Sequence, residues 1–384
     1  MKKKILIVTE RRADFSRFKP VLDLIKKDKS LRYELVVTGI HLLKQYGYSI
    51  NEIKKGGYKI SKTFKMYKYI SNKKKDDGAT MVYAMGVAIS KLSLIVKEIK
   101  PDIILSGFDI AANFAVTVVG AHMNIPVAHI QGGEVSGTID ESLRHAMSKF
   151  SHYHLVSNLD AKNRLIKMGE VKKNIFIVGC PSIEALYNQK KISADYFKKK
   201  IGIDINKKYI IAIQHSVTTE AKEASKQITE TIKAIDNFKM PTLFVCPNND
   251  AGSTFIIKKI KHNKKIYYTP TLTLQEYKNL LEKCFALVGN SSSGIHEASS
   301  FLKPVINIGS RQNGRLRSKN IIDVSYSSTQ ILKYLKKLEK NNYYKKLVKN
   351  LKNPYEKPNT SLNILKAIKS IKFSTDVIQK RITY

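Results

Sequence analysis

The chain has 384 residues, of which 43% are hydrophobic and 26% are charged, and its formal net charge is +37. This length and composition are ordinary for a globular protein with two full-sized cores. No apolar run approaches the roughly 18–20 residues that cross a bilayer, so we expect no membrane segment. Cys180, Cys246 and Cys284 are odd in number and far apart, which favours reduced thiols over a disulfide framework or a zinc site.

The N-terminus, residues 1–9, starts with three lysines like a signal peptide, but its apolar stretch is short and charged residues follow at once. We therefore expect a first β-strand and a cytoplasmic protein. The net charge would also suit a nucleic-acid-binding protein. However, lysine runs at 54–55, 73–75, 198–200 and 336–337 are spread over many predicted surfaces, without a recognition motif. A lysine-biased composition explains the charge more simply, so we expect an anionic small substrate and no nucleic-acid partner.

Short apolar strands alternate with amphipathic helices in the first half of the chain. Strands are predicted at residues 5–8, 35–37, 102–105, 127–130, 153–156 and 175–178, and helices at 18–27, 81–99, 111–123 and 142–150. Uniformly apolar strands in such alternation are typical of a parallel sheet covered on both faces. Residues 1–185 are therefore predicted to form a doubly wound, Rossmann-like domain.

The same alternation continues in the second half. Strands are predicted at residues 209–213, 242–245, 286–288 and 304–307, and helices at 221–238, at 274–284 and from Ile295 onward. Residues 186–365 are predicted to form a second Rossmann-like domain, and residues 366–384 a C-terminal helix that packs back on the first domain. The predicted fold is thus α/β, with two doubly wound domains and a cleft between them. Ligands should bind in this cleft, beyond the C-terminal ends of the strands.

The most informative segment is Asn290–Ala298, which follows an apolar strand and opens a predicted helix. Small residues there let the backbone approach a ligand, and a helix N-terminus attracts phosphate. Glu297, one turn later, would accept hydrogen bonds from a ribose diol. This pattern predicts a nucleotide diphosphate site. The simpler alternative is a serine-rich loop with a serine N-cap.

Polar clusters also follow the other predicted strands. They lie at residues 11–16, 106–110, 131–141, 214–219 and 247–252. Each alone is compatible with an ordinary capped loop. Together, at the C-terminal ends of parallel strands, they predict one shared site.

At these residues the chain resembles the hydrolysing UDP-N-acetylglucosamine 2-epimerases of sialic acid and related nonulosonate synthesis. The matching segments are 12–16, 132–140, 144–145, 179–182, 214–215, 217–219, 247–248, 250–253, 289–292, 311–312 and 314–315. The resemblance implies two Rossmann-like domains arranged as in the B-type glycosyltransferases. It also implies elimination of the nucleoside diphosphate to give a 2-acetamidoglycal, followed by hydration with inversion at C2.

The resemblance implies a role for each matching residue. Catalytic roles fall on Asp109, Gln131, Asp140, Arg144 and His215, and nucleotide contacts on Arg12, Ser16, Asn248, Asp250, Ser291, Ser292, Glu297 and Arg315. The carboxylates would handle the proton and the water, while charged groups stabilise the departing diphosphate. We expect no metal and no cofactor, a nucleotide-sugar substrate, and a homo-oligomer, either a dimer or a tetramer.

Two departures from the family pattern bear on the substrate. The family carries His-Gly-Asp-Arg where this chain has residues 107–110, so Asp109 keeps its place but Ile110 replaces an arginine. A family glutamate implicated in catalysis is Gln131 here, and an amide cannot act as a base. Either another carboxylate takes over, or the chemistry is arranged for another substrate, or activity is lost. An apolar residue near the sugar favours a 6-deoxy sugar, so nucleotide-linked N,N'-diacetylbacillosamine of legionaminic acid synthesis is preferred over UDP-N-acetylglucosamine.

Two other classes of protein stay open. A glycosyltransferase of the same two-domain fold would use the same phosphate loop but would consume an acceptor. A nucleic-acid-binding protein would account for the charge but not for the ordered polar clusters, and its affinity would fall steeply with salt.

Overall fold

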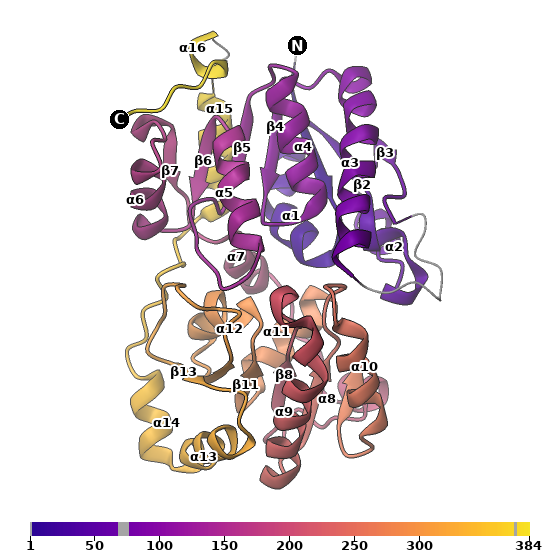
Figure 1. Cartoon of the computed structure of the whole chain (residues 1–384), viewed down its shortest axis with the longest axis vertical. Helices are drawn as coiled ribbons and strands as arrows, with labels where there is room; N and C mark the ends of the chain where they lie inside the picture. The colour runs from indigo at the N-terminus through magenta and orange to yellow at the C-terminus, as the bar shows by residue number, and fades with distance from the viewer. Residues whose placement is uncertain (1, 68–76, 372–374) are drawn as a thin grey trace.

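The structure is a computed structural model that describes residues 2–67, 77–371 and 375–384; the lysine run at 73–75 lies outside this part. Figure 1 shows two α/β bodies stacked along the long axis, each built around its own sheet. The chain builds the first sheet, then the second, and returns to the first body at its C-terminus.

The first sheet is parallel throughout, with strand order β3-β2-β1-β4-β5-β6-β7. Its strands are β1 (Lys3–Thr9), β2 (Leu31–Val37), β3 (Lys62–Thr63), β4 (Ile103–Gly107), β5 (Val127–Ile130), β6 (Tyr153–Val156) and β7 (Ile175–Ile177). The accompanying helices are α1 (Arg12–Lys27), α2 (Ile50–Lys55), α3 (Gly78–Ile99), α4 (Ala111–His122), α5 (Asp140–Phe150), α6 (Leu159–Lys167) and α7 (Pro181–Tyr187). Short 3-10 turns occur at Gly39–Leu42, Lys44–Tyr46 and Lys172–Asn174.

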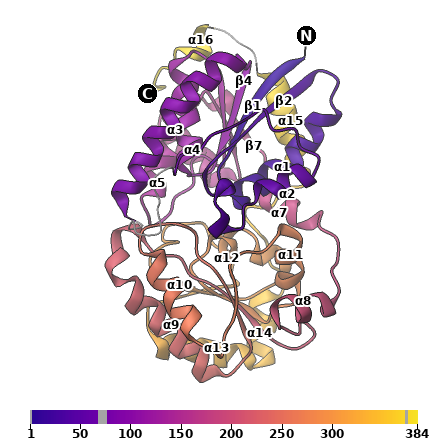
Figure 2. The same cartoon turned by 90° about the vertical axis from the view of Figure 1, so that its right-hand side faces the viewer.

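Alternate residues of β1 feed two separate cores. Ile5 and Ile7 pack with α1, whereas Leu6 and Val8 pack with α3 and α4. Figure 2 shows α3 and α4 on one side of the sheet and α1 on the other. Because both faces are covered, the buried central part of β1 is apolar at successive positions, Ile5 to Val8, and such runs made the strands recognisable in the sequence.

The second sheet is also parallel, with strand order β10-β9-β8-β11-β12-β13. Its strands are β8 (Ile210–Ile213), β9 (Thr242–Val245), β10 (Tyr267–Thr269), β11 (Ala286–Gly289), β12 (Val305–Ile308) and β13 (Ile321–Val324). The helices are α8 (Ala194–Ile201), α9 (Ala224–Phe238), α10 (Ser253–His262), α11 (Leu274–Lys283), α12 (Ser292–His296), α13 (Ser328–Glu339) and α14 (Asn341–Val348), with 3-10 turns at Thr218–Glu223 and Ala298–Phe301. The α/β class with two Rossmann-like sheets is therefore confirmed.

The C-terminal helix α15 (Thr360–Ser370) packs on the first body, beside α1, and α16 (Thr375–Ile378) follows it. Ile364 and Ile368 of α15 join the core that contains Phe18. Lys369 also pairs with Asp28 at 2.7 Å. The domain limits 1–185, 186–365 and 366–384 stay a prediction.

Three predicted helices differ from the structure. The first begins at Arg12 instead of residue 18, because Asp14 accepts the backbone N–H groups of Glu10 and Arg11 and so stabilises an earlier start. The helix predicted at 221–238 is divided into a 3-10 turn and α9, with non-helical dihedral angles at Glu220. The helix expected from Ile295 onward belongs to α12, which ends after one turn, at His296.

Helix α3 corrects the expectation that no segment is long and apolar enough to cross a membrane. Its most apolar window has a mean hydropathy of 1.7, although Lys91 interrupts the apolar run. In the structure it packs along α4 and buries Ala84, Ala88 and Leu92. The outer side of the helix exposes Val82 (68%) and Leu94 (65%). Length and composition alone therefore do not distinguish this helix of the α/β layer from a membrane span.

Candidate functional site

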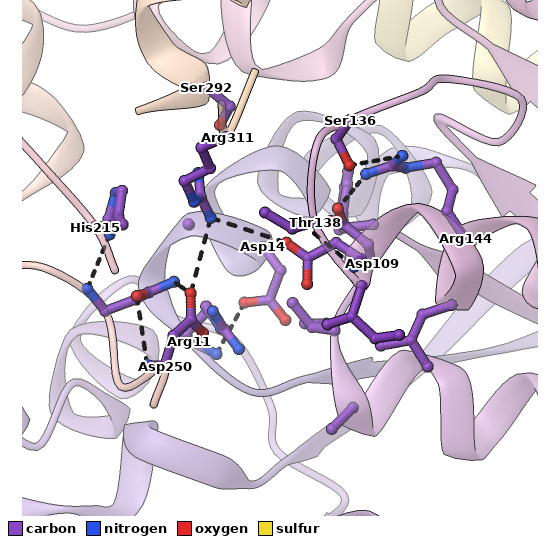
Figure 3. Close-up of a pocket in the computed structure, with 18 of the residues that line it drawn as sticks. Arg11, Asp14, Asp109, Ser136, Thr138, Arg144, His215, Asp250, Ser292 and Arg311 are labelled. Atoms are coloured by element: carbon purple, nitrogen blue, oxygen red, sulfur yellow. Dashed lines mark hydrogen bonds and ion pairs between the residues drawn. The ribbon is translucent and has the colours of Figure 1, made fainter. Parts of the chain in front are cut away.

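A cavity of about 240 Å³ lies between the two sheets. Its walls are the segments that follow β1, β4 and β5 in the first sheet and β8, β9, β11 and β12 in the second. Figure 3 shows side chains from both halves of the chain converging there. The cavity occupies the position at which open parallel sheets bind ligands, so it is the candidate functional site.

The structure brings most of the predicted residues to this cavity. Those that line it are Asp109, Gln131, Asp140, Arg144, His215, Asn248, Asp250, Ser291, Ser292 and Arg315. Arg12, Ser16 and Glu297 are not among the lining residues. Arg12 bonds Glu52 and Thr271, the Ser16 hydroxyl donates to the Ala13 carbonyl, and the Ser293 hydroxyl donates to Glu297. Their expected nucleotide contacts stay predictions.

The helical start of α1 explains why Arg12 and Ser16 lie elsewhere. Because α1 begins at residue 12, its cavity-facing positions follow helical spacing and are Ala13, Asp14 and Arg17, next to Arg11. Had the capping role of Asp14 been recognised in the sequence, these residues would have been found. Burial raises the pKa of Asp14 to about 6, against the lowering effect of the backbone N–H groups that it accepts.

Asp109 and Asp140 reach the cavity from different loops and are held in different states. Asp109, which is partly exposed, forms an ion pair with the buried guanidinium of Arg144. Burial raises the pKa of Asp109, but Arg144 and Arg315 lower it more, so the carboxylate is ionised. Burial, and then the charge of Asp109, raise the pKa of Asp140 to about 6. Asp140, like Asp14, is therefore a cavity carboxylate whose proton is exchangeable near neutral pH.

Asp140 is not the N-cap of α5. The helix begins at Asp140 itself, its N-cap is Ile139, and no side chain caps the turn. The backbone N–H of Asp140 donates to the Thr138 hydroxyl at 3.3 Å. The Asp140 side chain therefore forms no N-cap hydrogen bond in this helix.

Arg311 brings a cation to the middle of the cavity. Its guanidinium lies 3.8 Å from both Asp140 and Asp250 (Figure 3). Asp250 also accepts from the amide of Asn248 at 2.7 Å. Arg311 appeared in the sequence only as a matching residue without a role, and its place shows that it belongs to the site.

His215 presents a neutral ring. Burial lowers its pKa well below the usual value, and the charge of Arg311 adds to this effect. The backbone N–H of Asn248 donates to His215 Nδ1 at 3.1 Å, so the ring proton is on Nε2. With Nδ1 engaged by Asn248, the neutral ring of His215, which lines the cavity, keeps its Nε2–H as a hydrogen-bond donor.

Several buried donors of the cavity residues lack a partner within the described residues. The Nε–H groups of Arg11, Arg311 and Arg315 make no hydrogen bond there. Buried donors are normally satisfied, and guanidinium N–H donors left over in this way suit an anion such as a diphosphate. The helix α12 is short, so side chains rather than a helix dipole supply most of this field.

One wall of the cavity is apolar. It consists of Met81, Met85, Phe108, Ile110, Ile139 and Leu143. Ile110 is the N-cap residue of α4 and is 8% exposed. The lining of the cavity therefore includes both cationic and apolar side chains. Among the described residues no group of three or more His, Cys, Asp or Glu side chains is placed to hold a metal ion.

Glu134 and His296 also line the cavity, although the sequence analysis assigned them no role. The Glu134 carboxylate lies 3.0 Å from His296 Nε2 and 3.2 Å from a guanidinium nitrogen of Arg315. It also lies beside the amide of Gln131. Glu134 is far from His296 and Arg315 in the sequence, so no local sequence pattern predicts that they are in contact.

Comparison with known proteins identifies the family. Residues 23–369 match the family model described as UDP-N-acetylglucosamine 2-epimerase. A UDP-N-acetylglucosamine 2-epimerase of Neisseria meningitidis serogroup B is 35% identical over 331 residues, which cover 86% of this chain and 85% of the relative. A UDP-N,N'-diacetylbacillosamine 2-epimerase (hydrolyzing) of Legionella pneumophila is 35% identical over 335 residues, covering 86% and 88%. A GDP/UDP-N,N'-diacetylbacillosamine 2-epimerase (hydrolyzing) of Campylobacter jejuni is 33% identical over 329 residues, covering 84% of each.

Solved structures show the same fold. A Neisseria meningitidis UDP-GlcNAc 2-epimerase bound to UDP-GlcNAc has a TM-score of 0.78 at 18% identity, covering 95% of this chain and 99% of that one. A UDP-N-acetylglucosamine 2-epimerase from Listeria monocytogenes has a TM-score of 0.79 at 16% identity, covering 96% of each. With the family model spanning nearly the whole sequence, the chain belongs to the UDP-N-acetylglucosamine 2-epimerase family.

Proposed function

We propose that the protein is a hydrolysing nucleotide-sugar 2-epimerase, which releases a nucleoside diphosphate and a free manno-configured 2-acetamido sugar. The observation that supports this most directly is that arginines and an ionisable carboxylate line the same cavity. The buried Nε–H groups of Arg11, Arg311 and Arg315, which have no partner among the described residues, suit a diphosphate, and the pKa of Asp140 near Arg311 is about 6. The names of the Legionella and Campylobacter relatives include hydrolysis, which favours this reaction over epimerisation of the intact nucleotide sugar.

In the proposed reaction the diphosphate leaves first. Arg311, the Nε2–H of His215 and the Ser292 hydroxyl stabilise its negative charge as the C1–O bond breaks. Asp140 accepts the C2 proton, and a 2-acetamidoglycal results. Hydration then consumes one water: a solvent-derived proton adds to C2 from the opposite face, the hydroxyl group of water adds to C1, and the proton held by Asp140 returns to solvent. Asp109, ionised beside Arg144, stabilises the positive charge that develops at C1 in both steps.

We propose nucleotide-linked N,N'-diacetylbacillosamine as the substrate, with 2,4-diacetamido-2,4,6-trideoxymannose as the product. The support is the apolar wall at Met85, Ile110 and Leu143, which suits a C6 methyl group better than a hydroxymethyl group. The pathway that we propose for this product is legionaminic acid synthesis. The second candidate is UDP-N-acetylglucosamine, converted to N-acetylmannosamine for sialic acid synthesis, and the Neisseria relative favours it. Both uridine and guanosine nucleotides are compatible with the relatives' names.

We further propose a cytoplasmic homo-oligomer, a dimer or a tetramer. The exposed apolar residues of α3, Val82 and Leu94, support a contact between copies. Light scattering coupled to gel filtration tests this proposal with Leu94→Glu. The variant should dissociate at micromolar concentration, and a wild-type monomer at the same concentration would contradict the proposal.

A panel of nucleotide sugars tests the function. The protein is incubated with UDP- and GDP-linked N,N'-diacetylbacillosamine and with UDP-N-acetylglucosamine, and the products are identified by NMR. Free manno-configured sugar and nucleoside diphosphate should form without any acceptor. An epimerised nucleotide sugar would show the non-hydrolysing reaction. Turnover that requires an acceptor sugar would show a glycosyltransferase instead.

The apolar wall gives the substrate test. Ile110→Asn places a polar group against the position proposed for the C6 methyl group. It should lower kcat/KM for the diacetylbacillosamine nucleotide about tenfold relative to UDP-N-acetylglucosamine, the scale expected for one methyl contact. An unchanged ratio would mean that Ile110 does not face C6.

A further inference from the structure

Glu134 is a buried carboxylate whose oxygens are fully engaged. One oxygen accepts from the Ser157 hydroxyl at 2.8 Å and from the Gln131 amide nitrogen at 3.2 Å. The other lies 3.0 Å from His296 Nε2 and 3.2 Å from the Arg315 guanidinium. Arg315 also lies 2.7 Å from His296 Nε2, so the tautomer of His296 decides whether Glu134 accepts from the imidazole or from Arg315 alone on this side. In both cases polar groups of the protein enclose the carboxylate.

These contacts join the two halves of the chain. Glu134 and Gln131 follow β5 in the first sheet, whereas His296 ends α12 and Arg315 follows β12 in the second. His296 is one turn beyond Ser292, which lines the proposed diphosphate site. The loop with Glu134 is thereby connected to the proposed diphosphate site.

Glu134 also fixes the orientation of Gln131. Arg17 donates to the Gln131 amide oxygen at 3.3 Å, while the amide nitrogen donates to Glu134. Gln131 has a positive φ of 60°, which non-glycine residues adopt only where surrounding contacts hold them. An acidic residue at 131 would instead place two carboxylates in contact.

We infer that Glu134 is a positioning residue: its ionised carboxylate fixes the Gln131 amide in the cavity and ties that amide to the diphosphate-binding half through His296 and Arg315. For turnover this inference rests on the proposed function. Its structural part, the coupling of Gln131 with Glu134, is independent of activity. No proton is transferred by Glu134 in this account.

The experiment compares Glu134→Gln with a matched control, Glu170→Gln. Glu170 is also buried, and it pairs with His154 and Lys380 away from the cavity. Both variants should lower Tm. Only Glu134→Gln should lower kcat, by at least tenfold, on the nucleotide sugar that the wild type uses. The dependence of its kcat on pH should keep the fall in activity at acidic pH that the wild type shows.

Two outcomes overturn the inference. If Glu134→Gln loses Tm as the control does but keeps wild-type kcat, Glu134 is only structural. If kcat of the variant no longer falls at acidic pH, Glu134 is an acid–base group.

If the wild type turns over none of the sugars, the proposed function is refuted, but the contact between Gln131 and Glu134 can still be tested. The test compares the Tm values of the two single variants and of the double variant. Gln131→Glu should lower Tm at pH 8, and adding Glu134→Gln should recover more than half of that loss, because one carboxylate then again faces one amide. Strictly additive Tm shifts would show that the two side chains are not coupled, and the inference would be wrong.

Discussion

At the scale of single residues, Asp109 and Asp140 differ in pKa because different charged groups surround them. Asp109 is paired with Arg144, while Asp140 faces Arg311 only at 3.8 Å. A direct ion pair stabilises the ionised form more than a distant charge does, so the two groups differ in pKa. This difference supports the proposed roles, with proton transfer at Asp140 and electrostatic stabilisation by Asp109.

The variant Asp140→Asn should lower turnover about a hundredfold or more. It should also raise Tm at neutral pH, because ionising a carboxyl whose folded pKa is near 6 costs stability. The sign follows from the raised pKa: the cost is absent below the unfolded value of roughly 4, grows between about pH 4 and 6, and is constant above. Turnover and differential scanning calorimetry across this pH range measure both effects. Wild-type turnover would remove Asp140 from the mechanism, and a lower Tm with unchanged turnover per folded molecule would show that its role is structural.

Asp109→Asn should also lower turnover about a hundredfold or more, but with the opposite effect on stability. The pKa of Asp109 is held below its usual value, so its ionised form stabilises the fold above the unfolded pKa, and that stability is lost as the pH falls. The variant leaves Arg144 buried without its charged partner and should lower Tm at pH 7. Equal Tm values for wild type and variant, measured by calorimetry, would show that the ion pair is not stabilising.

Ser292→Ala tests the diphosphate site. It should weaken nucleotide binding by about 1–2 kcal/mol, the scale of a hydrogen bond to a charged group. Calorimetric titration with UDP and with GDP gives the affinities. If both affinities are unchanged, the segment acts only as the cap of α12, whose N-cap residue is Ser291.

Gln131→Glu tests the departure from the family pattern. The new carboxylate would lie beside Glu134 and near Asp109, and like charges in a closed cavity disfavour ionisation. We expect lower turnover of the diacetylbacillosamine nucleotide and no matching gain on UDP-N-acetylglucosamine. Assays of both sugars with both proteins decide the point. A strong gain on UDP-N-acetylglucosamine would refute our preference for the diacetylated sugar.

At the scale of elements, helix α5 connects the site to the C-terminal tail. Its N-terminal turn carries Asp140 and its second turn carries Arg144, whereas Lys380 donates to the carbonyl groups of Ser148, Lys149 and Ser151 at its other end. A cation at a helix C-terminus satisfies carbonyl groups that have no partner within the helix. Lys380 also pairs with buried Glu170 at 2.6 Å.

Lys380→Met should therefore lower Tm by several degrees, because it leaves Glu170 and the carbonyl groups at the end of α5 less satisfied. The matched control is Lys366→Met, on the exposed side of α15, which should leave Tm nearly unchanged. Thermal unfolding followed by circular dichroism measures both. Equal Tm values for the two variants would show that the contact of Lys380 does not stabilise the fold.

Helices and strands were predictable where a single sequence pattern, such as an apolar run, determines the local structure. The buried parallel strands were found because apolar residues fill both of their faces, as in β8 and β12. The start of α1 at Arg12 was missed because the residues before Phe18 are mostly charged or polar and lack an apolar helical pattern. The helix nevertheless starts there, because Asp14 caps its N-terminus. The 3-10 turn before α9 was also missed, since a single non-helical residue leaves the apolar periodicity intact.

At the scale of the whole molecule, the two parallel sheets face each other across the cavity with their C-terminal strand ends (Figures 1 and 3). The position of the site followed from this topology, since all polar clusters were expected at those ends. Contacts such as that between Glu134 and Arg315 were not predictable, because they depend on how the two bodies meet. The sequence therefore predicts which loops form the site better than it predicts their mutual contacts.

The most direct test of the proposed chemistry is turnover in deuterium oxide, followed by NMR of the released sugar. Elimination removes the C2 proton and hydration returns one from solvent, so the free manno-configured sugar should carry one deuterium at C2. The nucleoside diphosphate should appear in equal amount. Release of a sugar that keeps its original C2 hydrogen and configuration would mean simple hydrolysis and would contradict the account.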